Sequence, residues 1–457
     1  MMLIAATILL VTLVGCLCTV WGSAGEGIGI PVIAIATFTY VYLWQPTYMI
    51  WREQLGYFLT DLMVVKGLLV PAAALLCLMW GWQRGSRGMR KRVSRTVSAR
   101  AWSARRLYNF GLAAAIVGTV LHLVMVQRSG GFLQAYGQAH GHGFDWAQNT
   151  AYLYMSPLWV QSGLAMMIFS GNKLNLSGWR GGAIYVFAAA FALNGVLMGS
   201  RHDAFSICSI LWVGWCLARR RWPTIARAVP ALFIACSAAL LMVGYRNVLH
   251  LGEHKPNTPS FAEAATTGVA SEFADLRMRT SGVEFVAHAV TLETVDETQK
   301  YHWGLNWLYE YTVQVVPRIW WPEKPYRFET PGITQDDVSS VTGVRLASGY
   351  APGLVADLYS QFGLLSLFFF MWLGWCAKRL VLRAVYGNRP IDVCAYIMAF
   401  SLSLNVFGQG FGAILVAFPY SMVPVLLYHW AEGSQRHMAG GLIAGCRFRP
   451  AAMRPIF

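Results

Sequence analysis

Charged residues are scarce in this sequence: Asp, Glu, Lys and Arg make up 12% of the 457 residues, and only 21 residues are acidic. Hydrophobic residues make up 56%, and the mean hydropathy is +0.45. Soluble domains contain about 25% charged residues, so the composition excludes an ordinary soluble protein. Apolar runs of roughly 17 to 25 residues recur instead, each long enough to span a bilayer. The sequence therefore predicts an all-α polytopic membrane protein.

The sequence also lacks the short patterns of common catalytic and cofactor sites. It contains no Walker motif, no Gly-x-Ser-x-Gly, no His-Glu-x-x-His and no Cys-x-x-Cys. Its nine cysteines all lie in apolar runs or in the basic C-terminal tail, so no disulfide framework or zinc site is predicted. Only His122 and His429 fall inside apolar runs, which leaves no pair of axial ligands for a haem. We therefore expect no cofactor and no bound metal.

Acidic residues are concentrated in one long polar segment, residues 246–350. It holds 13 of the 21 Asp and Glu residues but only 9 Lys and Arg, which gives it a charge of −4. The whole chain carries +15, so the apolar remainder carries +19, mostly in short loops. Basic residues collect in the cytoplasmic loops of membrane proteins. The positive charge therefore indicates topology and not a nucleic-acid partner.

Eleven spans are predicted, at residues 2–21, 28–46, 57–82, 107–127, 151–170, 181–199, 204–218, 228–244, 351–377, 391–407 and 413–430. The first has no basic n-region and no cleavage site, so we interpret it as a retained span and not a signal peptide. Residues 83–106 contain nine basic residues and no acid, which places this loop in the cytoplasm and the N-terminus outside. The chain then divides into spans one to eight (1–245), an extracytoplasmic, periplasmic loop (246–350), spans nine to eleven (351–430) and a basic cytoplasmic tail (431–457).

The long loop has helical patterns of its own. A capping box, Ser260-Phe261-Ala262-Glu263, opens one predicted helix, and two more are expected at 282–297 and 305–316, the last ended by Pro317. Four tryptophans predict interfacial helices on the bilayer surface: Trp303, Trp307, Trp320 and Trp321. Residues 329–348, rich in Gly, Ser, Asp and Thr, are expected to be mobile. They include Asp336-Asp337, an acidic pair of the kind that binds metals, but a mobile pair makes a poor site.

Ionisable side chains at the outer mouths of the spans are the candidate site residues, because charge near the bilayer is costly unless a ligand or partner uses it. Planar guanidinium groups bind pyrophosphate with two hydrogen bonds each, so we assign this ligand to Arg201, Arg246, Arg279 and Arg318. Pairing with the carboxylates of the loop is the alternative for these arginines. The candidate catalytic bases are His202, Asp203, Glu284 and Glu310, with His250, His254, His288, His302 and Asp357 also on the predicted outer side.

Two stretches carry a resemblance to a known family. They are Val316-Pro317-Arg318-Ile319-Trp320-Trp321-Pro322-Glu323-Lys324-Pro325 and Gly353-Leu354-Val355-Ala356-Asp357-Leu358-Tyr359, the second followed by Phe362-Gly363. In these stretches, and at Gly199-Ser200-Arg201 and Arg246, the chain resembles the oligosaccharide repeat unit polymerases of bacterial surface polysaccharide synthesis, the O-antigen polymerase type. The resemblance covers residues 180–365, and the first third of the chain carries no such signature.

The resemblance implies a metal-independent, inverting glycosyltransferase of the integral-membrane C-type superfamily, located in the bacterial inner membrane. Such an enzyme transfers a growing glycan from undecaprenyl pyrophosphate to the terminal sugar hydroxyl of a second lipid-linked repeat unit. The implied partners are the undecaprenyl-pyrophosphate-linked oligosaccharide and membrane lipids, with a chain-length regulator and a flippase as candidate partner proteins. The residues fit this chemistry, because fixed arginines stabilise the pyrophosphate as it leaves and positioning of two large substrates lowers the barrier further.

Three other functions are open on the sequence alone. An O-antigen ligase differs mainly in its acceptor. A polysaccharide or lipid transporter predicts internal repeats and ionisable residues near the middle of the bilayer. The chain has no repeat, and its few ionisable residues in spans lie nearer the span ends: Asp61, Lys66, Asp357 and Asp392. Of these, Asp61 and Lys66 are expected to be structural, and a scaffold function leaves the outer arginines unexplained.

Overall fold

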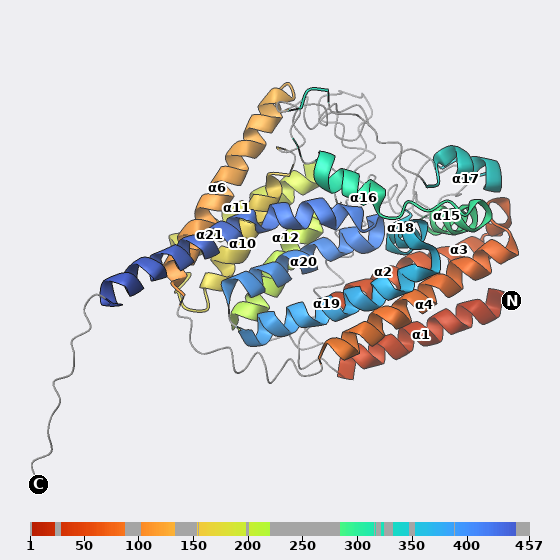
Figure 1. Ribbon diagram of the computed structural model, residues 1–457, viewed down its shortest axis with the longest axis horizontal. Helices are drawn as coiled ribbons and strands as arrows, with labels where there is room; N and C mark the ends of the chain where they lie inside the picture. Colours follow the sequence, from red (N-terminus) through yellow and green to blue (C-terminus); the bar gives the residue numbers. More distant parts are fainter. Residues whose placement is uncertain are drawn as a thin grey trace, which may run out of the picture.

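The computed structural model describes residues 2–22, 29–86, 102–132, 153, 155–197, 201–219, 284–314, 316, 321–323, 332–346, 352–387 and 389–444. Every regular element within these ranges is helical, as predicted. Long helices lie side by side in a bundle, and three short helices from the loop lie along its upper side toward one end (Figure 1). The elements are α1 (Met2–Gly22), α2 (Ile30–Phe38), η2 (Thr39–Trp44), α3 (Gln45–Trp51), η3 (Leu55–Tyr57), α4 (Asp61–Gly85), α6 (Ala104–Arg128), α10 (Pro157–Ser170), α11 (Trp179–Leu197), α12 (Arg201–Arg219), α15 (Glu284–Thr298), α16 (Leu305–Tyr309), η5 (Glu310–Gln314), α17 (Gln335–Thr342), α18 (Gly353–Phe362), η6 (Gly363–Leu365), α19 (Ser366–Gly387), α20 (Pro390–Gln409) and α21 (Gly412–Ala444).

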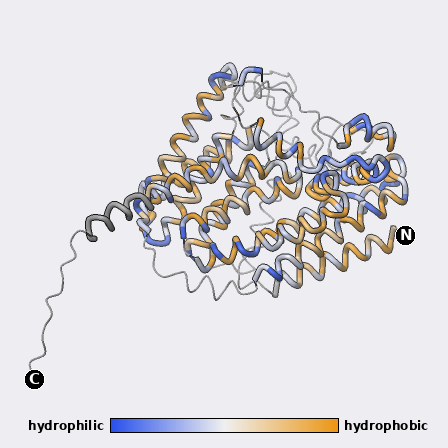
Figure 2. Tube along the Cα trace, in the orientation of Figure 1, coloured by the Kyte–Doolittle hydropathy of each residue, from blue (hydrophilic) through white to orange (hydrophobic). Residues whose placement is uncertain are grey.

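Six segments of the described chain are long and apolar enough to cross a membrane: Met2–Thr19, Asp61–Gly85, Ala104–Arg128, Gly353–Gly387, Pro390–Gln409 and Ile414–Glu432. An α-helix rises about 1.5 Å per residue, so about 20 residues cover the roughly 30 Å hydrocarbon core. Many of their apolar side chains stay exposed, such as Leu3 (81%) and Phe368 (65%), which lipid accommodates and water does not. Hydrophobic residues accordingly follow the long helices in Figure 2. These features are those of a helical membrane protein.

The six segments correspond to the predicted spans at 2–21, 57–82, 107–127, 351–377, 391–407 and 413–430. Three further predicted spans appear as α10, α11 and α12, of which α10 has only 14 residues and α12 has a shorter apolar part, Phe205–Arg219. The run 28–46 forms α2, the π-helix η2 and α3 in direct succession. The span predicted at 228–244 lies outside the described residues, as does the helix predicted to begin at Ser260.

The bundle has two chemically different ends. The helices α4, α12 and α19 run in one direction and α20 runs in the other, and the contacts of α4 with α19 and of α12 with α20 fit this order (Figure 1). The last residues of α4, α12 and α19 therefore share one end with the first residues of α20. We call this the basic end. The opposite end, where α15 contacts α4 and α18, is called the loop end.

Cations at the basic end lie over tryptophan rings. The distances from cation to ring centroid are 4.4 Å for Arg84 and Trp80, 4.6 Å for Lys378 and Trp82, 3.7 Å for Arg379 and Trp375, 4.9 Å for Arg219 and Trp215, 5.6 Å for Arg180 and Trp179, and 4.1 Å for Lys173 and Trp102. Tryptophan rings attract cations through their faces, and both residue types gather at membrane interfaces. The basic end therefore has the composition of a membrane interface.

Glycines allow the backbones of α4 and α19 to touch. A Cβ atom at Gly81 would overlap the carbonyl oxygen of Met371, and a Cβ atom at Gly374 would overlap that of Leu78. Lipid gives no hydrophobic driving force between helices, so close backbone packing supplies van der Waals attraction in its place. The helices α6 and α10 meet through glycines in the same way.

The segment 353–387 is longer than a bilayer requires and is broken near the loop end. The helix α18 ends at Phe362, and Gly363 has a φ of +57°, a left-handed value that glycine adopts without strain. A short 3-10 turn follows, and α19 begins at Ser366. Because α19 alone has 22 residues, it can cross the core by itself. The short helix α18 is thus left at the mouth of the bundle, against α15.

The expectation of a mobile stretch at 329–348 is wrong over its centre, where α17 forms. The Asp337 amide donates to Thr334 Oγ1 at 3.2 Å and the Thr334 amide donates to Asp337 Oδ2 at 2.8 Å, which is a capping box. Lys300 also pairs with Asp337 at 2.6 Å. The hydrogen bond from Lys300, followed by those from Thr334, lowers the pKa of the Asp337 carboxyl to about 2. Asp337 is therefore the third helical residue of the capping box, and both of its carboxylate oxygens are engaged, so the pair Asp336-Asp337 is a poor metal candidate.

The boundary predicted at residue 431 is not a break in secondary structure. The helix α21 has 33 residues and continues to Ala444. Its last turns project away from the bundle in Figure 1. The first part of the predicted basic tail therefore extends the last span as a helix.

Candidate functional site

The helix α15 lies deepest among the loop elements at the loop end. Its residues 285–292 are all buried, and it packs against α4, α17, α18 and η2. A helix that is buried on all sides requires neighbours on all sides. The predicted helix at 282–297 is thereby confirmed, as a core helix and not as an interfacial one.

The first turn of α15 is held by Gln45, the first residue of α3. Gln45 Nε2 donates a hydrogen bond to the Glu284 carboxylate, and the Phe285 amide donates to Gln45 Oε1 at 3.0 Å. The first amides of a helix have no partner within the helix, so Gln45 satisfies one of them. Glu284 remains half-buried. Its carboxylate is thus positioned without being sealed from the surroundings.

Aromatic contacts join this turn to the start of α18. The rings of Tyr42 and His288 meet edge to face with centroids 4.7 Å apart. A Cβ atom at Gly353 would lie 3.3 Å from the Tyr42 hydroxyl, so the start of α18 is close to the same ring. Tyr42 belongs to the π-helix η2, a rare conformation that is frequent at functional sites. We call Tyr42, Gln45, Glu284 and His288 the outer polar cluster.

His288 is the fully buried member of the outer polar cluster. Its side chain has 0% exposure, and neither ring nitrogen makes a hydrogen bond of normal geometry, although the ring lies against the backbone of Gly67. Burial disfavours the charged imidazolium. The pKa of His288 is therefore lowered from 6.5 to about 3.

Replacing His288 with leucine is expected to flatten the dependence of stability on pH. Below about pH 6.5 the unfolded chain binds a proton at His288 that the folded protein excludes down to about pH 3, so folded stability falls as the pH falls. The His288→Leu variant should lose this slope, about 1.4 kcal/mol per pH unit. The measurement is the unfolding free energy in mild detergent from pH 6.5 to 4.5. His288→Asn, which also does not titrate, should show the same flat slope with lower stability, and a wild-type slope in either variant would contradict the assignment.

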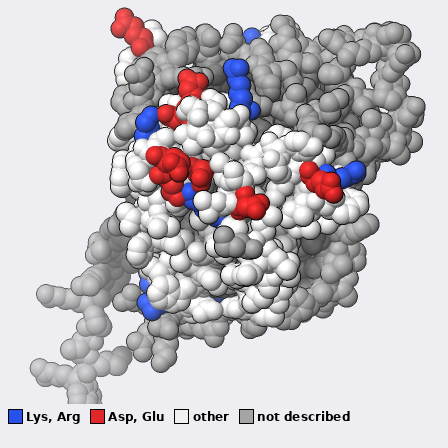
Figure 3. Space-filling view, turned by 90° about the vertical axis from the view of Figure 1, so that its right-hand side faces the viewer, with Lys and Arg blue, Asp and Glu red and all other residues white. Residues whose placement is uncertain are grey.

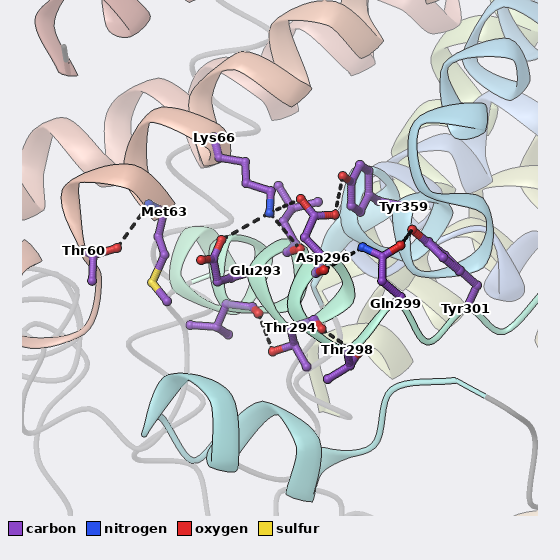
Figure 4. A network of polar contacts seen from close by, with 12 residues as sticks. Thr60, Met63, Lys66, Glu293, Thr294, Asp296, Thr298, Gln299, Tyr301 and Tyr359 are labelled. Atoms are coloured by element: carbon purple, nitrogen blue, oxygen red, sulfur yellow. Dashed lines mark hydrogen bonds and ion pairs between the residues drawn. The ribbon is translucent and has the colours of Figure 1, made fainter.

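Lys66 on α4 ties the middle of α15 to the bundle (Figure 4). Its Nζ atom lies 3.2 Å from Glu293, pairs with Asp296 and donates to the carbonyl of Leu292 at 3.1 Å. On α18, the Tyr359 hydroxyl donates to Asp296 at 2.7 Å. Two carboxylates and one cation thus connect three helices that are distant in the sequence. Lys66 has the structural role expected of it, which is to dock α15.

Asp357 lies in α18, and it is bonded to the turn between α20 and α21. The Phe411 amide donates to its carboxylate at 2.6 Å, and Gln361 Nε2 donates at 3.3 Å. The turn approaches closely because Gly410 has a φ of +126°, and a Cβ atom there would lie 2.7 Å from Asp357. Asp357 caps the start of α21 in this arrangement. We therefore assign it to the fold and not to catalysis.

The chain after α15 is fastened to the last turn of α18 by two backbone hydrogen bonds. Trp307 follows and is buried, with its ring centroid 5.1 Å from that of Phe411. Trp307 is thus a core residue, although the sequence predicts it at the bilayer surface. Trp303 and Trp321 are exposed, and Trp320 lies outside the described residues.

The structure places the other predicted site residues apart from the outer polar cluster or leaves them undescribed. Asp203 lies in the first turn of α12, whose neighbours are α10, α11 and α20, whereas Glu284 begins α15. Arg201 and His202 lie in the same turn as Asp203, and Glu310 lies in η5, but the side chains of these three are outside the described part. Arg246, Arg279 and Arg318 are outside the described residues altogether. Of the predicted site residues, Glu284 lies with Tyr42 and Gln45, two residues that the sequence does not indicate as part of a site.

One local signal could have identified Gln45. It is an amide at the end of a long apolar run, followed by Pro46, so its side chain stands where a membrane helix meets water. Polar groups at such positions usually have a partner. Nothing local distinguishes Tyr42 from the other aromatic residues of the same run.

The loop end is rich in carboxylates. Asp and Glu groups gather on the described surface seen from this side, with Lys and Arg groups between them (Figure 3). Exposed acids include Asp61, Glu297, Glu323 and Asp336. Within the described ranges, no three His, Cys, Asp or Glu side chains are grouped as a metal ion requires.

Compared with known proteins, the chain matches no family model, no curated protein and no solved structure.

Proposed function

We propose that this protein polymerises oligosaccharide repeat units carried on undecaprenyl pyrophosphate, by glycosyl transfer at the outer face of the bacterial inner membrane. The observation that carries the proposal is the position of Glu284, which Gln45 holds at the loop end of the membrane helices. Its helix α15 packs against α18, the segment that resembles the polymerases. Both substrates of such an enzyme are lipid-anchored, so their reacting sugars meet at the membrane boundary. A positioned carboxylate at that boundary suits the reaction.

In the proposed reaction, the acceptor sugar hydroxyl attacks the anomeric carbon of the donor. The bond from that carbon to the pyrophosphate oxygen breaks, and Glu284 takes the hydroxyl proton as general base, a role worth about 10²- to 10⁴-fold in rate. Lipid pyrophosphate leaves with its negative charge, which Arg201, Arg246, Arg279 and Arg318 stabilise. The scheme is inverting and metal-independent, as in the family that the chain resembles. His202, Asp203 and Glu310 are the alternative bases.

The proposal includes a topology and a set of partners. Eleven spans place the acidic loop 246–350 in the periplasm and the C-terminus in the cytoplasm. The cations stacked on tryptophans at the basic end support this orientation, because basic residues favour the cytoplasmic side. A chain-length regulator and a flippase are the proposed partner proteins.

The test is polymer formation by the purified protein in lipid, with a lipid-pyrophosphate-linked repeat unit as substrate. Glu284→Gln keeps an oxygen that accepts from Gln45 but removes the base, so chain extension should fall at least about 100-fold. Glu297→Gln is the matched control, because Glu297 is exposed on the same helix, and it should extend chains at the wild-type rate. Arg201→Ala and Arg246→Ala should fold but form no ladder.

Two results would count against the proposal in different ways. A Glu284→Gln variant that extends chains at the wild-type rate removes Glu284 as the base and leaves the polymerase itself standing. A wild-type protein that binds the lipid-linked substrate and never extends it overturns the polymerase proposal. The O-antigen ligase or the polysaccharide or lipid transporter is then favoured.

A further inference from the structure

A cavity of about 810 Å³ lies at the basic end between α10, α11 and α12. From α12 it is lined by Cys208, Leu211, Trp212 and Trp215, which stand at positions i, i+3, i+4 and i+7 and so share one face. From α11 it is lined by Ile184 and Tyr185, together with the turn between α10 and α11. The volume is typical of a small-molecule site. The walls are mostly apolar, so the occupant must be largely apolar as well.

The mouth of this cavity is polar and cationic. Asn175, Ser177 and Arg219 line it, and Lys173 and Arg180 adjoin the lining residues in the sequence. Arg219 is exposed. A guanidinium group in that position can give a phosphate two charge-assisted hydrogen bonds.

The described segments that line the cavity carry no counter-charge for this mouth. Neither lining segment, 171–185 or 208–219, contains an acidic residue, and the sequence after Arg219 adds further arginines but no acid before Glu253. At the same end, Asp392 on α20 lies in the field of two arginines of its own, Arg383 and Arg389. The anion that complements the mouth is therefore best supplied by another molecule.

We propose that the cavity binds one anionic phospholipid from the membrane leaflet at the basic end. Its phosphate lies at Arg219, and its acyl chains lie along the exposed rings of Trp215 and Tyr185. Basic pockets between membrane helices are suited to anionic headgroups. The lipid fills the space between α11 and α12 and so holds these helices together. This site lies at the opposite end of the bundle from the outer polar cluster and is independent of the proposed glycosyl transfer.

Native mass spectrometry tests the proposal on the full chain in detergent, titrated with phosphatidylglycerol or phosphatidylcholine. Wild-type protein should retain one phosphatidylglycerol, and Arg219→Gln should bind it about tenfold more weakly, the effect of losing one charge-assisted interaction. Arg84→Gln is the matched control, because Arg84 also lies over a tryptophan at the basic end but does not line the cavity. It should bind as wild type does. Equal retention of phosphatidylcholine, or equal weakening by both substitutions, would overturn the proposal.

Maleimide labelling, read peptide by peptide, gives a second measurement. Cys208 and Cys18 are both exposed, but Cys208 lines the cavity and Cys18 lies on α1. Phosphatidylglycerol should slow the labelling of Cys208 about tenfold and leave that of Cys18 unchanged. Protection by a polyprenyl phosphate in place of phosphatidylglycerol assigns the cavity to a different lipid. Labelling of Cys208 at the same rate with and without phosphatidylglycerol shows that this lipid does not enter the cavity, and either result refutes the inference.

Discussion

Alanine in place of Gly81 or Gly374 is expected to cost at least about 3 kcal/mol of folded stability, the largest effect we predict for a single methyl group. The added Cβ atom meets a backbone carbonyl oxygen of the opposite helix, and a backbone cannot move aside as a flexible side chain can. The helices α4 and α19 must therefore separate, which sacrifices the close packing that holds them together in lipid. The measurement is the unfolding free energy in mixed micelles, with recovery of monodisperse protein as a second readout.

Gly182→Ala is the matched control for these two substitutions. A Cβ atom at Gly182, in α11, would meet nothing within 4 Å, so the alanine should be neutral or stabilise the helix by up to about 1 kcal/mol. All three substitutions add the same methyl group to a helical glycine. Equal stability for Gly81→Ala and Gly182→Ala would show that α4 and α19 do not pack in this register.

Replacing Lys66 with methionine is expected to destabilise the protein by about 2 to 4 kcal/mol and to abolish any activity that depends on α15. The exposed fractions of the Lys66 and Glu293 side chains are 18% and 15%. Without the ammonium group, the largely buried Glu293 and Asp296, whose side chain is 37% exposed, are left as an acidic pair with no cation between them. The unfolding free energy measures the loss, and proteolysis at 299–304 would report release of the loop.

Lys300→Met provides the comparison for Lys66→Met. Lys300 pairs with one carboxylate, that of Asp337, and its side chain is 52% exposed, so the loss should be about 0 to 1 kcal/mol and should shrink in salt. Adding Glu293→Gln to Lys66→Met should restore part of the lost stability, because the two substitutions share one interaction. Equal effects of Lys66→Met and Lys300→Met would contradict the docking role of Lys66.

The positions of the long helices follow from the sequence because a span requires only a local property, a run of apolar residues of sufficient length. The bond between Gln45 and Glu284 joins residues 239 apart, so no window of sequence contains both partners. The same holds for Lys66 and Glu293, which are 227 residues apart. The sequence shows which polar residues the outer polar cluster contains, but it does not show that they lie together in the fold.

Two local errors have a physical origin. In the stretch around α17, composition indicates mobility, yet Thr334 and Asp337 stand at the spacing of a capping box and Gly343 ends the helix with a φ of +70°. Three specific residues therefore determine the conformation of this stretch, and the average composition of its twenty residues does not. The break at Gly363 was missed for the opposite reason, since apolar residues continue on both sides of it and hydropathy does not register a change of backbone direction.

The long sequence separation of the Lys66 network also sets an order of events during synthesis. Lys66 leaves the ribosome 227 residues before Glu293, an interval of roughly 10 to 45 s at about 5 to 20 residues per second. During that time the lysine has neither of its carboxylate partners. Its position near the start of α4 allows the ammonium group to stay at the water boundary until Glu293 and Asp296 have been synthesised. The Lys66 network therefore forms only after Glu293 has been made, and the packing of α19 against α4 forms later still.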